Sequence, residues 1–252
     1  MTNYSIAEEY TLPSKGKVYE EKVNPIIKLR SMTTEEEMKR LAPSERPYKN
    51  LCEIIDDCMV EPCGISSYDM CVADYQFLLH KLRIVTYGSN YNTNSTCPYC
   101  GSYNEHNMNL DDLQVNELEN DDIKKYMQFK LPRSGHEVTI RIQTPRMIDN
   151  VTFENNEMRR KSNGKSSDKT FILTLRSLID TIDGKVVDPI KKENFIRQLP
   201  MMDTNYIMKH AQKLVESFGL DTAVSNKCSM CGLDYTSHFR VSPEFFGPSV
   251  DI

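Results

Sequence analysis

The N-terminal residues alternate short apolar and polar positions and show no helical periodicity. Val23, Ile27 and Leu29 have the spacing of an extended chain, and nearby prolines and a glycine interrupt any long helix. We therefore expect residues 1–31 to form an extended, hairpin-like arm with too few apolar side chains for a core of its own.

A short helix is predicted just after this arm. Thr33 or Thr34 can cap its N-terminus, and Thr34 and Glu37 have the spacing of a capping box. The acidic residues of its first turn suit the positive end of the helix dipole. Pro43 is expected to end it.

Two longer helices follow. Apolar side chains recur at the spacing of one helical face over residues 48–59 and again over 68–86. Ser66 or Ser67 can cap the second of these helices, and Gly88 is expected to close it.

A small antiparallel sheet is predicted in the middle of the chain. Val138, Ile140 and Ile142 alternate strictly with polar residues, which indicates a strand with one buried face. The predicted strands cover residues 108–110, 126–131 and 136–143, with a turn at 132–135.

More helices and a final strand are predicted in the rest of the chain. The polar residues 161–168 contain too few apolar side chains to pack, so we expect a mobile loop there. The predicted helices cover 145–161, 169–182, 189–198 and 203–218, with a turn at 183–185, a strand at 235–241 and an apolar tail at 245–248.

Charge and hydropathy limit the function classes. The formal net charge of −5 has the wrong sign for a protein that holds nucleic acid by neutralising phosphates, so nucleic acid is not an expected partner. The first residues carry neither a basic nor an apolar targeting segment, and the apolar stretches are too short to span a bilayer. We expect a protein that is neither secreted nor bound to a membrane.

Four of the eight cysteines form two copies of the motif C-x-x-C-G. They are Cys97 and Cys100, followed by Gly101, and Cys228 and Cys231, followed by Gly232. Two intervening residues let both thiolates point at one ion, and the glycine permits the turn that directs backbone N–H groups at the sulfurs. Four thiolates make a closed tetrahedral zinc site, which is structural and leaves no position for catalysis.

Redox chemistry is the competing interpretation of the first motif. Cys-Pro-Tyr-Cys is also the active-site tetrapeptide of glutaredoxins, where the first thiolate lies at a helix N-terminus. Here a polar run precedes the motif, no helix is predicted after it, and redox chemistry leaves the second pair unexplained. We therefore predict structural zinc, which would tie the middle of the chain to its C-terminal part because 127 residues lie between Cys100 and Cys228.

The other cysteines and two histidines carry weaker signals. The cysteines interpreted as small core residues, at helix-face or turn spacing, are Cys52, Cys58, Cys63 and Cys71. His106 and His238 lie near the two C-x-x-C-G motifs, here called the knuckles. Either could replace a cysteine as a ligand or contact the ligands without binding the metal. We favour an ordinary surface position for both histidines.

Taken together, these patterns predict an α+β fold, rich in helix, with a small antiparallel sheet and a ribbon-like four-cysteine zinc-knuckle site. Only 10 glycines in 252 residues argue against a sandwich or barrel that repeats tight turns. The predicted regions are an arm at 1–31, a helical region at 32–96, the first knuckle and sheet at 97–144, a helical region with the mobile loop at 145–220, and the second knuckle with the C-terminal strand and tail at 221–252.

Recognised catalytic motifs are missing from the sequence. The chain contains no H-E-x-x-H, G-x-S-x-G, P-loop or dinucleotide-binding glycine pattern. The one strong site is a closed one. We expect a protein without enzymatic activity.

A series of short segments stands in a distinctive order over residues 10–115, with further matches at 228–232 and 245–248. The series comprises Leu12-Pro13-Ser14-Lys15-Gly16 with Tyr19, Leu29 to Glu37, Asp74, Leu78-Leu79, Leu82-Arg83, Thr86-Tyr87-Gly88, Tyr91 and Cys97-Pro98-Tyr99-Cys100-Gly101. In order and spacing it resembles the baseplate hub assembly family of T-even-like, contractile-tailed bacteriophages.

The resemblance implies a hub subunit or hub assembly factor that binds other phage tail and baseplate hub proteins. Such a protein works in the host cytoplasm during assembly and, if retained, lies in the virion baseplate. Because the resemblance is densest at Leu12–Gly16 and along residues 74–83, we expect these segments to form one functional surface.

A zinc-ribbon protein that binds nucleic acid or acts in transcription is the alternative, because it shares the two knuckles. A basic, aromatic-rich face around them would favour it, and Lys227, His238 and Arg240 are too few to do so. A metal-dependent enzyme is the third possibility, and it needs an open coordination position that four thiolates do not leave.

Overall fold

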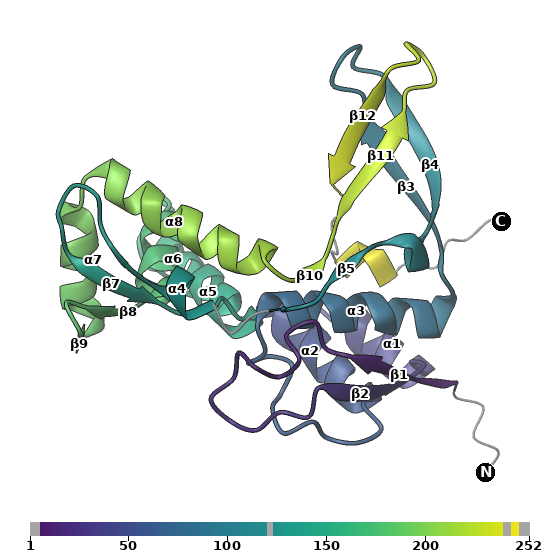
Figure 1. Ribbon diagram of the computed structural model, residues 1–252, viewed down its shortest axis with the longest axis horizontal. Coiled ribbons are helices and arrows are strands. Elements are labelled where there is room, and N and C mark those ends of the chain that lie inside the picture. Colours follow the sequence, from purple (N-terminus) through teal and green to yellow (C-terminus); the bar gives the residue numbers. More distant parts are fainter. Residues whose placement is uncertain (1–5, 120–122, 239–242, 247–252) are drawn as a thin grey trace.

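The computed structural model describes residues 6–119, 123–238 and 243–246. The described chain is α+β and has three parts (Figure 1): a helical body over residues 6–88, an α/β lobe over residues 123–216, and a projecting two-ribbon lobe made of residues 90–109 and 223–238. None of its helices is both long and apolar enough to cross a bilayer. The predicted fold class, with small antiparallel sheets, is confirmed for these residues.

The predicted N-terminal hairpin is present. Strand β1 (Ala7–Thr11) pairs antiparallel with β2 (Ile26–Arg30). Ile27 and Leu29 of β2 are buried in the core of the helical body. The arm is therefore packed against the helices along its second strand.

Helix α1 (Thr34–Leu41) begins one residue earlier than the predicted capping box. Thr33 is the N-cap, and Glu36, not Glu37, completes the box by accepting from the Thr33 backbone N–H at 2.7 Å. Thr33 has the extended conformation of an N-cap, and the helix itself begins at Thr34, one position before the predicted start. Glu36 also accepts a 2.7 Å hydrogen bond from Arg30, so the cap ties the helix to β2.

The Glu36 carboxylate should make the stability of the fold acid-sensitive. Hydrogen bonding from Arg30, joined by Thr33, lowers the pKa of Glu36 from 4.5 to about 2. Because the folded-state pKa is the lower one, the carboxylate stabilises the fold above about pH 4.5 and this contribution is lost as pH falls toward 2. We expect Glu36→Gln to lower the thermal midpoint at pH 7 and to flatten its acid limb.

Thermal melts between pH 2 and 7 test this expectation. Glu35→Gln, on the exposed side of the same turn, is the matched control and should leave both midpoint and acid limb unchanged. Parallel curves for the wild type and Glu36→Gln would contradict the assignment.

The next two helices complete the body. Helix α2 (Pro47–Cys58) lies close to its predicted range, whereas α3 (Val72–Tyr87) begins several residues later than its apolar pattern indicated. Ser66 and Ser67 do not cap α3, because their hydroxyls bond to α2 instead. Gly88 closes α3 as predicted, with a φ of +83°.

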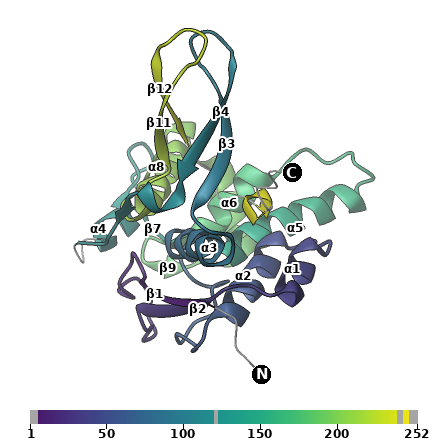
Figure 2. The ribbon, with the colours of Figure 1, turned by 90° about the vertical axis from the view of Figure 1, so that its right-hand side faces the viewer.

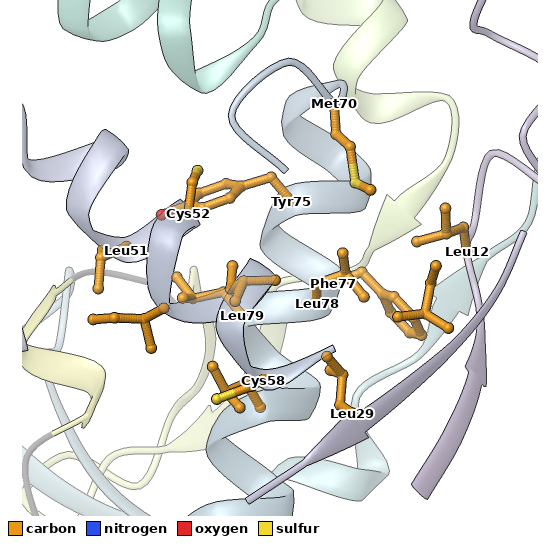
Figure 3. Packing of buried hydrophobic residues seen from close by; sticks show 14 of the residues in the cluster. Leu12, Leu29, Leu51, Cys52, Cys58, Met70, Tyr75, Phe77, Leu78 and Leu79 are labelled. Atoms are coloured by element: carbon orange, nitrogen blue, oxygen red, sulfur yellow. The ribbon is translucent and has the colours of Figure 1, made fainter. Parts of the chain in front are cut away.

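Side chains from the hairpin, α2 and α3 meet in one core (Figure 3). The labelled members are Leu12, Leu29, Leu51, Cys52, Cys58, Met70, Tyr75, Phe77, Leu78 and Leu79. All four cysteines outside the knuckles are buried, which confirms their interpretation as core residues.

The α/β lobe contains a four-stranded antiparallel sheet in the order β6-β7-β8-β9. Its strands are β6 (Gln128–Lys130), β7 (Glu137–Ile140), β8 (Ile179–Ile182) and β9 (Lys185–Val186). The predicted turns join β6 to β7 and β8 to β9. Apolar side chains of the sheet and of the helices around it form a second core.

Two predicted boundaries in this lobe are wrong. Helix α4 (Ile123–Met127) occupies the start of the strand predicted at 126–131. Helix α6 (Thr170–Leu178) ends early, and Ile179 to Ile182 enter the sheet as β8. Short apolar runs do not distinguish strand from helix by periodicity, and pairing with β7 decides the outcome here.

The remaining helices of the lobe follow the prediction closely. They are α5 (Pro145–Lys161), α7 (Pro189–Gln198) and α8 (Met201–Glu216). Neither helix nor strand lies between α5 and α6, which agrees with the loop expected at 161–168. The mobility of that loop stays a prediction.

The two-ribbon lobe consists of two antiparallel hairpins that lie side by side and point away from the body (Figures 1 and 2). Strands β3 (Asn90–Thr96) and β4 (Tyr103–Asn109) form the first ribbon, and β11 (Ala223–Lys227) and β12 (Asp234–His238) form the second. Of the short strand predicted at 108–110, the first two residues are the end of β4, and Leu110 begins a 3-10 turn. Residues 239–241 of the other predicted strand lie outside the described residues.

Three short elements hold the base of this lobe. Strand β5 (Val115–Asn116) pairs with β10 (Gly219–Leu220), which joins the chain segments leading from and to the ribbons. A 3-10 turn, η2 (Pro243–Phe246), places Phe245 and Phe246 in the core of the helical body. The start of the predicted apolar tail is thus buried, and residues 247 and 248 lie outside the described residues.

Candidate metal centre

Each ribbon ends in one C-x-x-C-G motif, and the two turns share one hydrogen-bond pattern. The N–H of Cys97 donates to the carbonyl of Ser102, and the N–H of Gly101 to the carbonyl of Cys97, both at 2.9 Å. Cys228 and Gly232 repeat these bonds at 3.0 Å in the second turn. The glycines have φ values of +71° and +73°, a left-handed conformation that glycine adopts without strain.

The structure brings all four predicted thiols together. Their sulfur atoms lie within 4.8 Å of one another, at 3.8 Å for Cys97 and Cys231 and 3.6 Å for Cys100 and Cys228. Four sulfurs at about 2.3 Å from one tetrahedral ion are separated by about 3.8 Å. The cluster has this spacing and is far too open for a disulfide, so it could hold one metal ion.

The electrostatics of the thiols favour a cation among them. The pKa of Cys228 is lowered to about 5, because the N–H of Cys231 and the hydroxyl of Ser102 point at its sulfur. The Leu233 backbone favours the Cys231 thiolate, but desolvation and the neighbouring sulfurs raise the pKa of that thiol to about 12. Several thiolates in this space therefore need a positive ion to offset their repulsion.

Asn104, which the sequence analysis did not identify, links the two knuckles. Its side chain is buried on β4, and its Oδ1 accepts hydrogen bonds from the Ser229 N–H at 2.9 Å and the Ser229 hydroxyl at 2.8 Å. Its Nδ2 donates to the carbonyl of Ser102 at 3.0 Å. One amide thus fixes the second knuckle to the first ribbon behind the sulfurs.

The two candidate histidines are not part of the thiol cluster. The Nε2 of His106 lies 2.9 Å from the hydroxyl of Ser95 and 3.2 Å from that of Tyr235, which places it between the ribbons below the sulfurs. His238 is exposed at the far end of β12. Neither side chain replaces a cysteine. His238 has the expected surface position, whereas His106 is half-buried between the ribbons.

The two-ribbon lobe has very little apolar core. Its buried cluster consists of Cys97, Cys228 and Tyr235. Two of these three side chains are the proposed ligands, so the same residues would serve as core and as metal site. A metal ion would connect two hairpins that have no backbone ladder between them.

The expected surface at Leu12–Gly16 and residues 74–83 is internal. Asp74 accepts hydrogen bonds from the Ser14 N–H at 3.0 Å, the Ser14 hydroxyl at 2.5 Å and the Tyr19 hydroxyl at 2.6 Å. Ser14, Asp74 and Arg83 are fully buried. The structure brings the two segments together but removes these residues from solvent, so the prediction of an exposed functional surface there is wrong.

Comparison with known proteins gives one match. No curated protein and no solved structure is significantly similar to this chain. The family described as T4 bacteriophage base plate protein matches residues 3–247, which include both ribbons, both knuckles and the α/β lobe. The chain therefore belongs to the T4 bacteriophage base plate protein family.

Proposed function

We propose that this protein is a non-enzymatic baseplate hub protein or hub assembly factor that binds other tail proteins and holds them ready for assembly. The family match over residues 3–247 carries the proposal, and the resemblance of the N-terminal segments to hub assembly proteins refines it. Its place of action is the host cytoplasm during assembly, and the virion baseplate if the protein is retained.

We propose further that the four thiols hold structural zinc. The all-sulfur donor set, the tetrahedral spacing and the N–H groups directed at the sulfurs fit zinc best among common ions. When bound, the ion cross-links the two ribbons. Asn104 positions the second knuckle, and Ser102 lies 3.1 Å from both the Cys100 and Cys228 sulfurs.

The absence of catalysis is part of the same proposal. Four protein ligands complete the coordination of a tetrahedral ion, so no substrate or water can reach it as a ligand. The protein then acts through the surfaces by which it binds other proteins. The large exposed side chains around the knuckles include Tyr99, Tyr103, Met230 and Leu233. Such apolar side chains suit a protein partner better than a phosphate backbone.

Co-expression with the hub proteins of the same phage tests the proposal directly. We expect a complex that survives size-exclusion chromatography, and a phage lacking the gene should fail to build complete tails. Normal infectious particles from that phage would contradict the role. Specific binding to nucleic acid at physiological salt, without a tail-protein partner, would favour the zinc-ribbon alternative.

Mass spectrometry separates the two forms of the proposal. Purified virions and infected-cell lysate are compared for peptides of this chain. A hub subunit is present in both samples at a fixed ratio to other baseplate proteins. An assembly factor is present in the lysate and depleted from virions.

A further inference from the structure

The outward face of the first ribbon, here called the amide face, is dominated by asparagine. Burial alternates along both strands, so that every second side chain faces the other ribbon and the rest face solvent. Cross-strand pairs place the outward residues in two parallel rows. These rows are Asn90, Asn92, Asn94 and Thr96 on β3, and Tyr103, Glu105, Asn107 and Asn109 on β4.

This composition is not explained by folding. Asparagine is among the residues depleted in strands, whereas β-branched residues such as threonine are enriched there. Although 27% of the chain is charged, Glu105 is the single charged residue on the amide face. Local departures from strand propensity are most often found where a surface has another task.

The amides are also unused within the protein. Asn109 caps the turn that follows β4 by accepting from the Asp111 N–H at 3.1 Å. In the described part of the chain, the side chains of Asn90, Asn92, Asn94 and Asn107 have no hydrogen-bond partner. An open groove runs across both strands here and is lined in part by Asn92, Asn94 and Tyr103.

The spacing of the amides matches that of a polypeptide backbone. Outward residues on one strand recur every two positions, or about 6.8 Å, which is also the two-residue repeat of an extended peptide. Each asparagine offers one carbonyl and one NH₂ group, the same acceptor and donor types that a peptide group presents. An extended segment laid along the ribbon therefore meets one amide at every second residue.

We propose that the amide face binds an extended, largely uncharged segment of a partner tail protein, with Asn92, Asn94 and Asn107 bonding to its backbone. Glu105 lies among these amides and favours one lysine or arginine in the segment, which fixes its register. Tyr103 packs against one of its side chains. This inference rests on the proposed function, because it names the surface through which tail proteins are recognised.

The test compares one triple variant and one double variant of the full chain. Asn92→Ala, Asn94→Ala and Asn107→Ala together remove the proposed contacts, whereas Ser225→Ala and Thr236→Ala alter the outward face of the second ribbon. The probes are the co-expressed hub proteins and overlapping peptides that span them. We expect at least about tenfold weaker binding for the asparagine variant and unchanged binding for the control.

Two further measurements sharpen the result. Metal content and circular dichroism should be the same for both variants and the wild type, because the substituted side chains are exposed. Two versions of a bound peptide, N-methylated at odd or at even positions, should differ. One should lose binding and the other keep it, since only every second peptide group faces the amides.

The outcomes separate this inference from the proposed function. If hub proteins bind the wild type and the asparagine variant equally well, the amide face is not the docking surface and the proposed function stands. If the wild type binds no hub protein, both proposals fail. If the asparagine variant loses affinity for host polysaccharide and keeps its affinity for hub proteins, the face recognises a sugar instead.

Discussion

Replacing both Cys228 and Cys231 by serine is expected to abolish metal binding and to unfold the two-ribbon lobe. Structural zinc contributes on the order of 10 kcal/mol, and isolated two-stranded hairpins are marginal in water. The lobe cannot compensate, because its buried cluster is Cys97, Cys228 and Tyr235. The helical body and the α/β lobe have their own cores and should remain folded.

Metal analysis and hydrogen exchange measure this directly. Wild-type protein purified without added metal should contain about one zinc per chain, and the double variant none. Amide protection should be lost in β3, β4, β11 and β12 alone. Ser225→Ala with Thr236→Ala, two exposed changes in the same ribbon, should keep zinc and protection. Wild-type protein without zinc, or protected ribbons in the cysteine variant, would refute the proposed site.

Asp74→Ala should destabilise the helical body strongly. The carboxylate is fully buried and accepts from the Ser14 N–H, the Ser14 hydroxyl and the Tyr19 hydroxyl. Alanine leaves these donors without an acceptor, at about 1–3 kcal/mol each. We expect a loss of about 3–5 kcal/mol in the free energy of unfolding, with the loop between β1 and β2 becoming accessible to proteases.

Asp69→Ala provides the matched control for this experiment. Asp69 lies on the same approach to α3, but its ion pair with Arg146 is partly exposed, with 42% of the Asp69 side chain accessible. Its loss should change stability by less than about 1 kcal/mol. Denaturant melts of both variants measure the difference. Equal midpoints for Asp74→Ala and wild type would show that the buried Asp74 contacts do not stabilise the helical body.

Local signals made parts of this fold predictable. Helix α5 was predicted with both its ends, because Pro145 at its first position and the basic residues of its last turn act within the helix itself. Strand β3 was missed, because Asn90 to Thr96 has no apolar alternation and its structure depends on pairing with β4. Similarly, β8 depends on pairing with β7.

The candidate site divides in the same way. The clustering of its four cysteines was predictable, because each C-x-x-C-G motif is local and is recognised from its spacing alone. Asn104 was not predictable, since its role exists only where β4 lies against Ser229, 125 positions away in the chain. Likewise, Ser14 and Tyr19 gain their meaning from Asp74 in a distant helix.

The long separation between the two knuckles sets an order of events during synthesis. Cys100 and Cys228 are 128 positions apart, so a nascent chain exposes its first pair of thiols for roughly 6–26 s before the second pair is translated. If the four thiols bind zinc, the complete site can close only after Cys231 has been translated and has left the ribosome. Metal loading then becomes a late step of biogenesis, and a truncated translation product cannot present the finished pair of ribbons to the assembling tail.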